Sequence, residues 1–287
     1  MAKGRELKGR IKSVENTKKI TRTLELVATS KMKRAVDRVA AARPYAAALT
    51  EVIGDLYSDE LAEQFLLLRQ PSQTKKVALI LLTSNRGLCG GFNANLSKEA
   101  RLRISEFESH GIEVELHAVG TKGIGYFRYI NRAMSSQRTD ISDRPTAADA
   151  ASLVDGLMER FVTGDIDAVY VTGSKFISAI STPPATTQVL PVKPPSNGKL
   201  KRDYLLSPSA EAILTELLPA YVKNSVYRAL VETAAAEQSS RRTAMKSATD
   251  NASDTLLSLR RTYNRARQAQ ITQEIAEIVG GAAALQG

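Results

Sequence analysis

The sequence is poor in cysteine, in bulky aromatic residues and in long apolar runs. Its 287 residues include one cysteine, Cys89, and no tryptophan, and aromatic residues make up 5% of the chain. One cysteine cannot form an intramolecular disulfide or a thiolate zinc cluster, so we expect a reducing, intracellular environment. Apolar runs such as residues 77–82 fall far short of the roughly 20 residues of a membrane span, and no apolar signal segment follows the basic N-terminus. We therefore expect neither a membrane-spanning nor an exported chain.

The net charge of +10 is concentrated at the two ends of the chain. Residues 1–40 hold twelve Lys or Arg against four Asp or Glu, and residues 221–279 hold nine against six. The middle of the chain is close to neutral. Basic terminal segments predict an acidic partner, which on charge alone could be nucleic acid, an anionic membrane surface or an acidic protein.

The N-terminal segment has the composition of one long helix. Residues 5–56 are rich in Ala, Leu, Lys, Arg and Glu and contain a single proline, Pro44, which predicts a helix of about 50 residues. In its second half, apolar residues recur in alternating steps of three and four, the pattern of a coiled-coil seam. The seam residues are Met32, Ala35, Val39, Ala42, Ala46, Leu49, Ile53 and Leu56.

In the first half of this helix the apolar residues no longer fall at the seam positions. When the same spacing is continued toward the N-terminus, the seam positions are Lys18 and Thr21, whereas Ile20 and Val27 lie on another face of the helix. We therefore expect this half to contact more than one partner.

The C-terminal segment predicts a second, longer helix. Ser207 and Pro208 form a typical helix start, and no glycine follows until Gly280, so about 70 residues, or roughly 105 Å, can be helical. So long and polar a helix needs a partner, and we expect the two terminal helices to wind on each other. Because both leave the same central region, they should pair antiparallel, with the second overhanging the first by about 27 Å.

The central region alternates between strand and helix patterns. The predicted strands are residues 77–83, 114–119 and 168–172, with 186–192 as a further candidate, and the predicted helices are residues 95–109, 124–131 and 146–163. Such alternation favours a parallel sheet with helices on its faces. The expected fold is therefore α/β with a long coiled coil: an antiparallel coiled coil of the terminal helices, residues 1–60 and 207–287, plus a central Rossmann-like α/β domain at residues 70–206.

Two glycine-rich turns follow the first two predicted strands. Residues 85–93 and 120–125 are phosphate-loop candidates by position, because backbone amides at a helix start attract anions. Neither has the G-x-G-x-x-G order, and a P-loop motif is missing from the sequence. The alternative is that these glycines serve only tight turns between strand and helix.

The sequence predicts no catalytic residues, no metal ligands and no bound cofactor. His110 and His117 lack the spacing of a metal site. Cys89 is expected to be a small buried residue of a turn. Asp165 and Asp167 lie in a turn before a strand, where Asp is common because its side chain can hydrogen-bond to the backbone of the turn.

Five stretches of the sequence resemble the gamma subunit of the rotary proton-translocating ATP synthase. They are residues 11–21 (IKSVENTKKIT), 28–32 (ATSKM), 85–93 (NRGLCGGFN), 244–251 (AMKSATDN) and 263–275 (YNRARQAQITQEI). The resemblance covers both ends and the middle of the chain without a large insertion.

The resemblance implies a central rotor shaft that couples proton flow through a membrane rotor ring to ATP synthesis or hydrolysis. In this family the terminal helices lie inside a hexamer of alpha and beta subunits, and the α/β domain lies with the epsilon subunit on the ring of c subunits. It further implies a non-catalytic subunit without a cofactor or a direct small-molecule substrate, peripheral on the cytoplasmic face of the bacterial plasma membrane.

The resemblance also implies roles for individual side chains. Contact with the beta subunits is expected from Arg241, Arg267, Gln268 and Thr272. The overhang has no coiled-coil partner, so Ile271, Ile275 and Ile278 are expected to be exposed in the free chain and enclosed by the hexamer as an apolar bearing. Basic side chains of the first helix, Lys31 among them, are expected to face acidic loops of the surrounding subunits.

Two other classes of function remain open from the residues alone. A basic coiled coil could bind nucleic acid, although its basic segments carry no recognition motif and no set of stacking aromatic residues. A stand-alone dinucleotide enzyme would need a cofactor that stays bound on purification.

Overall fold

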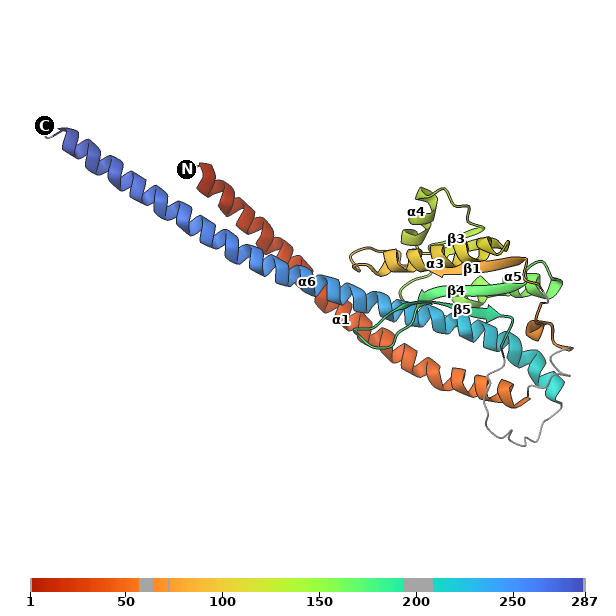
Figure 1. The fold of residues 1–287 in the computed structure, drawn as a ribbon. Helices are drawn as coiled ribbons and strands as arrows, with labels where there is room; N and C mark the ends of the chain where they lie inside the picture. Colours follow the sequence, from red (N-terminus) through yellow and green to blue (C-terminus); the bar gives the residue numbers. More distant parts are fainter. Residues whose placement is uncertain (1, 57–63, 72, 194–208, 286–287) are drawn as a thin grey trace. The chain divides into compact units, whose positions relative to one another are not determined.

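A computed structural model of the chain describes the backbone of residues 2–56, 64–71, 73–193 and 209–285 (Figure 1). Contacts group the chain into two compact units. The first unit is Met1–Ala28 with Arg242–Gly287, and the second unit is Thr29–Arg241. The two terminal helices each contribute one segment to each unit.

The terminal helices are long, as the sequence predicted. Helix α1 runs over Ala2–Leu56 and helix α6 over Ala210–Leu285, and each continues through its internal proline, Pro44 or Pro219. The predicted start of α6 at residues 207–208 lies outside the described residues. Within them, the hydroxyl of Ser209 accepts a hydrogen bond from the backbone N–H of Ala212 at 3.2 Å, which caps the first turn.

In the first unit, α1 and α6 pair antiparallel. The Thr249 hydroxyl donates to the Thr21 hydroxyl at 2.8 Å, and further along α6 the Arg260 guanidinium pairs with Glu15 at 2.6 Å. Because the α1 partner moves back along the chain as α6 advances, the helices run in opposite directions. The residues buried between them are small or polar as well as apolar: Thr21, Ala28, Met245, Thr249, Ala252 and Leu256.

The second unit contains a five-stranded sheet. Its strands are β1 (Lys76–Leu82), β2 (Glu113–Val119), β3 (Ser136–Arg138), β4 (Ala168–Ser174) and β5 (Pro184–Leu190). Their order is β3-β2-β1-β4-β5, and every pair is parallel except β4 with β5. A short 3-10 helix, Leu66–Leu68, precedes β1.

Helices cover both faces of this sheet. The connecting helices are α3 (Phe92–Ser109), α4 (Thr121–Tyr129) and α5 (Ala147–Thr163). The odd-numbered residues from Val77 to Leu81 pack with residues of α3 and α4, and the even-numbered residues from Ala78 to Leu82 pack with residues of α5 and α6. β1 is therefore buried on both sides, as a central parallel strand is.

Two details of the sheet differ from the sequence prediction. β5 is antiparallel, because the connection at residues 175–183 is too short for the crossover of about a dozen residues that a parallel neighbour needs. The edge strand β3 was not predicted, because it has only three residues, all polar, and so carries no apolar signal.

Candidate functional site

The seam residues of α1 lie along one buried line of the second unit. Ala35, Val39, Ala46, Leu49, Ile53 and Leu56 are buried, and Met32 and Ala42 are partly buried. Ala35 and Val39 pack against Val231 and Ala235 of α6. Every residue of α6 from 230 to 236 is buried, because other residues of this run pack with the clusters on the sheet. Small side chains therefore suit this part of α6, which is enclosed on more than one side.

The C-terminal part of α6 is exposed. Every residue from 271 to 281 is exposed, including Ile271 at 46%, Ile275 at 56% and Ile278 at 71%. These three isoleucines, spaced four and three residues apart, share one side of the helix. Helix α6 has 76 residues and α1 has 55, so α6 is longer by about 21 residues, or roughly 32 Å. That these residues project beyond α1 as an overhang enclosed by other subunits stays a prediction.

Three of the four expected beta-subunit contacts lie in or just before this exposed stretch. Arg267, Gln268 and Thr272 are exposed side chains of α6. Gln268 and Thr272 lie one helical turn apart, beside Ile271 and Ile275. The helix thus presents a guanidinium, an amide and a hydroxyl next to its exposed apolar residues.

Arg241 lies in the second unit and is not brought together with the other three. Its side chain is only 12% exposed and pairs with Glu237 at 2.7 Å. It also donates to the carbonyl oxygens of Gly87 at 3.2 Å and Arg86 at 3.3 Å. Burial raises the pKa of the Glu237 carboxyl, and the charge and hydrogen bond of Arg241 oppose that rise. In this conformation Arg241 ties α6 to the glycine-rich turn that follows β1.

Lys31 also has a partner within the chain. Its ammonium group pairs with Asp143 at 2.6 Å, and both side chains are about one-third exposed. The neighbouring basic residues Lys33 and Arg34 are exposed. In the free chain, Lys31 is therefore directed at an internal carboxylate, unlike the basic side chains around it.

The first glycine-rich turn connects several loops at the carboxyl end of the sheet. The Asn85 side chain donates to the carbonyl oxygens of Thr139 and Ile141, both at 3.0 Å, and accepts from the backbone N–H of Thr121 at 3.0 Å. Asn93 accepts from the backbone N–H of Ser84 at 3.0 Å. These bonds give the turn a structural role.

The second glycine-rich turn does not have the free amides of a phosphate loop. The backbone N–H groups of Thr121, Lys122 and Gly123 donate to Asn85, Ser84 and Thr83, so the first turn of α4 is satisfied internally. Gly120 has φ 96°, and a Cβ there would lie 2.2 Å from the Thr83 carbonyl oxygen. Glycine is required at this position by the close approach of β1, which accounts for it without an anion.

The other candidate residues make structural contacts. Arg160 forms two hydrogen bonds with Glu115 and lowers the pKa of that carboxyl to about 2. Burial lowers the pKa of His117, whose Nδ1 lies 2.8 Å from the Ser136 hydroxyl. Asp165 pairs with Arg160 at 2.6 Å. The described residues contain no group of three or more His, Cys, Asp or Glu side chains that could hold a metal ion.

Asp167 and Cys89 have similarly local roles. Asp167 accepts from the backbone N–H groups of Lys75 and Lys76. Cys89 is buried and lies 3.2 Å from the side-chain amide of Asn93. Within the described parts of the chain, no helix combines the length and the apolar character needed to cross a bilayer.

Comparison with known proteins identifies the family. A family model described as ATP synthase matches residues 3–285. The ATP synthase gamma chain of Gemmatimonas aurantiaca is 68% identical over 290 residues, which cover 100% of both chains. The chain belongs to the ATP synthase gamma-chain family. The gamma chain of Leptospira biflexa is 43% identical over 288 residues, covering 99% of this chain and 100% of its own.

Solved structures share the fold of this gamma-chain family member. A chain in the Euglena gracilis mitochondrial ATP synthase, rotational state 3, aligns with a TM-score of 0.68 at 19% identity, covering 99% of this chain and 95% of its own. A chain in the central stalk and c-ring structure of the Tetrahymena thermophila enzyme aligns with a TM-score of 0.62 at 24% identity, covering 80% and 99%. The expected coiled coil with a central α/β domain is therefore confirmed as the fold.

Sequence reasoning missed the internal partners of the charged residues. Glu237 precedes Arg241 by four residues, a spacing that permits an ion pair on a helix, but the burial of the pair comes from tertiary packing. No local pattern connects Lys31 with Asp143, which is 112 residues away in the sequence.

Proposed function

We propose that this chain is the central rotor shaft of a proton-translocating ATP synthase. It would couple proton flow through the membrane rotor ring to ATP synthesis or hydrolysis at a hexamer of alpha and beta subunits. Membership of the gamma-chain family supports the assignment. Among the structural features, the exposed stretch at residues 271–281 of α6 carries it, because no side chain of this stretch is buried by the described residues of the chain.

The exposed isoleucines give this stretch a reason to bind. Burying apolar surface is worth roughly 25 cal/mol per Å². Ile271, Ile275 and Ile278 would gain this free energy inside a ring of subunits, which would act as an apolar bearing. On α1, Ile20, Leu26 and Val27 are also exposed, although the residues around them pair with α6. Both helices of the first unit therefore have apolar surface available for surrounding subunits.

Polar residues in and just before this stretch would make contacts that depend on the angle of the shaft. We infer that Arg267, Gln268 and Thr272 engage the beta subunits one after another as the shaft turns. A guanidinium can bind a carboxylate with two hydrogen bonds and release it to the next subunit. Because each shaft angle offers different contacts to each beta subunit, rotation can shift the conformational equilibrium of each nucleotide site.

Arg241 can contact a beta subunit only after its own side chain rearranges. Its guanidinium would have to leave the carbonyl oxygens of Arg86 and Gly87 to meet a beta-subunit carboxylate. In the proposed cycle, contact with the hexamer at Arg241 is therefore coupled to the position of the turn after β1.

The proposed shaft works only as part of a larger complex at the membrane. The chain would be a non-catalytic subunit without a cofactor, bound to the alpha and beta subunits, to epsilon and to the c-subunit ring. Its place would be the cytoplasmic face of the bacterial plasma membrane, as a peripheral component. Nucleic acid and small-molecule substrates have no part in it.

A rotation assay tests the proposed function. A bead is attached through Lys98→Cys, an exposed position of α3, in a complex with immobilised alpha and beta subunits; the native Cys89 is buried. We expect ATP to drive turning in one direction. ATP hydrolysis without turning of a correctly assembled complex would contradict the proposal.

A pair of charge substitutions tests the bearing. Ile275→Asp would place a carboxylate in the enclosed surface and should weaken binding to the alpha and beta subunits by more than about tenfold. Leu102→Asp on α3, at a similarly exposed position, is the matched control and should leave binding unchanged. Equal effects of the two substitutions would show that residue 275 is not enclosed.

A further inference from the structure

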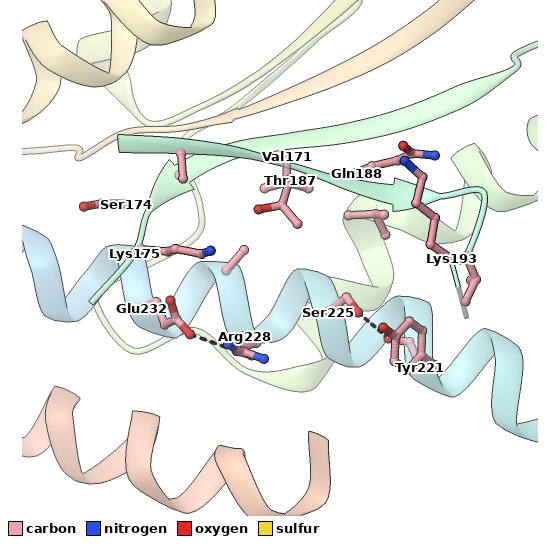
Figure 2. Close-up of a pocket in the computed structure, with 15 residues that line it drawn as sticks. Val171, Ser174, Lys175, Thr187, Gln188, Lys193, Tyr221, Ser225, Arg228 and Glu232 are labelled. Carbon is pink, nitrogen blue, oxygen red and sulfur yellow. Dashed lines mark hydrogen bonds and ion pairs between the residues drawn. The ribbon is translucent and has the colours of Figure 1, made fainter. Parts of the chain in front are cut away.

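A pocket of about 340 Å³ lies between the β4–β5 edge of the sheet and helix α6 (Figure 2). Apolar and polar side chains contribute to its lining in similar measure, with Val171, Val189, Val192 and Ala229 among the apolar ones. At Gly173 the helix comes so close that a Cβ would lie 2.6 Å from the Thr233 hydroxyl. The volume of the pocket lies at the lower end of the range of small-molecule sites in proteins.

The charges around this pocket are unbalanced. Lys175, Lys193 and Arg228 line it, and Glu232 is the one acidic residue among its lining residues. Glu232 is already engaged: it pairs with Arg228 at 2.8 Å and accepts from the backbone N–H of Phe176 at 3.4 Å. Among the described residues, neither Lys175 nor Lys193 has an ion-pair partner. Both lysines are exposed, so two solvated positive charges without an ion-pair partner among the described residues line the pocket.

The two lysines lie at opposite ends of the pocket. Figure 2 shows Lys175 at the end formed by Glu232 and Lys193 at the end formed by Tyr221. Thr187 lies between these ends, so a hydroxyl is available along the length of the pocket. A ligand that neutralises both lysines must extend over the apolar surface that separates them.

We propose that this pocket binds an elongated organic anion with a carboxylate or phosphate group at each end and an apolar body between them. Lys175 and Lys193 would each meet one anionic group, and the valine side chains would contact the body. The Tyr221 side chain adds a hydroxyl group at the Lys193 end, and Thr187 adds one between the two ends. The proposal is independent of the shaft function, because all these residues belong to the second unit.

Such a ligand would stabilise the second unit. It would bridge β4, β5 and α6, which meet at the pocket, and a ligand that binds only the folded state raises stability with its concentration. The effect can be measured on the full chain without any other subunit.

The test compares dianions with monoanions of the same length. Straight-chain dicarboxylates from succinate to sebacate, the bisphosphate of hexanediol and, as a monoanion, hexanoate are titrated against the full chain by calorimetry and thermal unfolding. We expect one length of dianion to bind best and to raise Tm, and hexanoate to bind more weakly than hexanedioate. Comparison of hexanedioate with the bisphosphate identifies the preferred anionic group.

Single substitutions test whether each lysine binds one anionic group of the ligand. Lys175→Met and Lys193→Met should each weaken binding of the best dianion by about fivefold, the upper end of what is expected for an ion pair of an exposed lysine. Lys98→Met is the matched control, because Lys98 is an exposed lysine of α3, which packs on the opposite face of the sheet. Equal binding of hexanoate and hexanedioate, an equal loss in Lys98→Met, or no response to any dianion would overturn the proposal.

Discussion

The same two helices are buried differently in the two units of the chain. In the second unit, α6 buries Leu214, Leu218, Val222 and Val226 in a core that includes the sheet. In the first unit the residues buried between α1 and α6 are mostly small or polar, and residues 271–281 of α6 are exposed. A helical sequence does not by itself bury a helix. In the second unit the sheet supplies the apolar surface, and in the first unit we propose that other subunits supply it.

This comparison predicts unequal stability. Each turn of the first unit buries little apolar area, so its helices should unfold at a lower temperature than the α/β core. A single two-state transition that includes all of the helical signal would contradict a difference between the units.

The largest effect is expected from the core of the second unit. Phe161 is 0% exposed, and Phe161→Ala should lower the free energy of unfolding by about 3–5 kcal/mol through the cavity that it creates. Ile275→Ala in the exposed stretch of α6 should have almost no effect on the free chain. Urea unfolding followed by tyrosine fluorescence and circular dichroism measures both; a similar loss in the two variants would remove the distinction.

A somewhat smaller effect is expected at Gly120. Gly120→Ala combines a φ of 96° with a clash against the Thr83 carbonyl oxygen and should cost about 2–3 kcal/mol. Gly125→Ala is the control, because a Cβ at Gly125 meets no atom within 4 Å. Unfolding measurements that rank Gly125→Ala as the more damaging change would show that the turn is not tightly packed.

Acid should weaken the second unit through Glu115. The pKa of Glu115 is about 2 in the folded chain against an ordinary value of 4.5, so folding favours its ionised form. This contribution, about 2–3 kcal/mol, is fully present above pH 4.5 and is lost as the pH falls toward 2. Unfolding of Glu115→Gln should depend less on pH over this range than unfolding of the parent chain; identical profiles would refute the assignment.

The smallest effect is expected for the ion pair of the first unit. Arg260 and Glu15 have side chains that are 60% and 37% exposed. Arg260→Ala should therefore change the free energy of unfolding by at most about 0.5 kcal/mol, and less at high salt. A loss of several kcal/mol in the helical transition would mean that this pair, and not apolar contact, holds the two helices together.

The parts of the fold that depend on periodicity could be predicted from the sequence. The seam from Met32 to Leu56, the alternation of strand and helix and the longer C-terminal helix all follow from local patterns. The direction of β5 and the short strand β3 could not, because they depend on connection length and on pairing with β2. At the candidate site, exposure of Ile271 followed from helix lengths, whereas the internal bonds of Arg241 depend on the position of the turn after β1.

Hydrogen exchange on the full chain, free and with the alpha and beta subunits, tests the central claim most directly. In the free chain we expect fast exchange at residues 271–281 and slow exchange in β1 and β4. With the hexamer, residues 271–281 should become strongly protected, while β1 and β4 should change little. Unchanged exchange at residues 271–281 in an assembled complex would contradict the proposal that surrounding subunits enclose the end of α6.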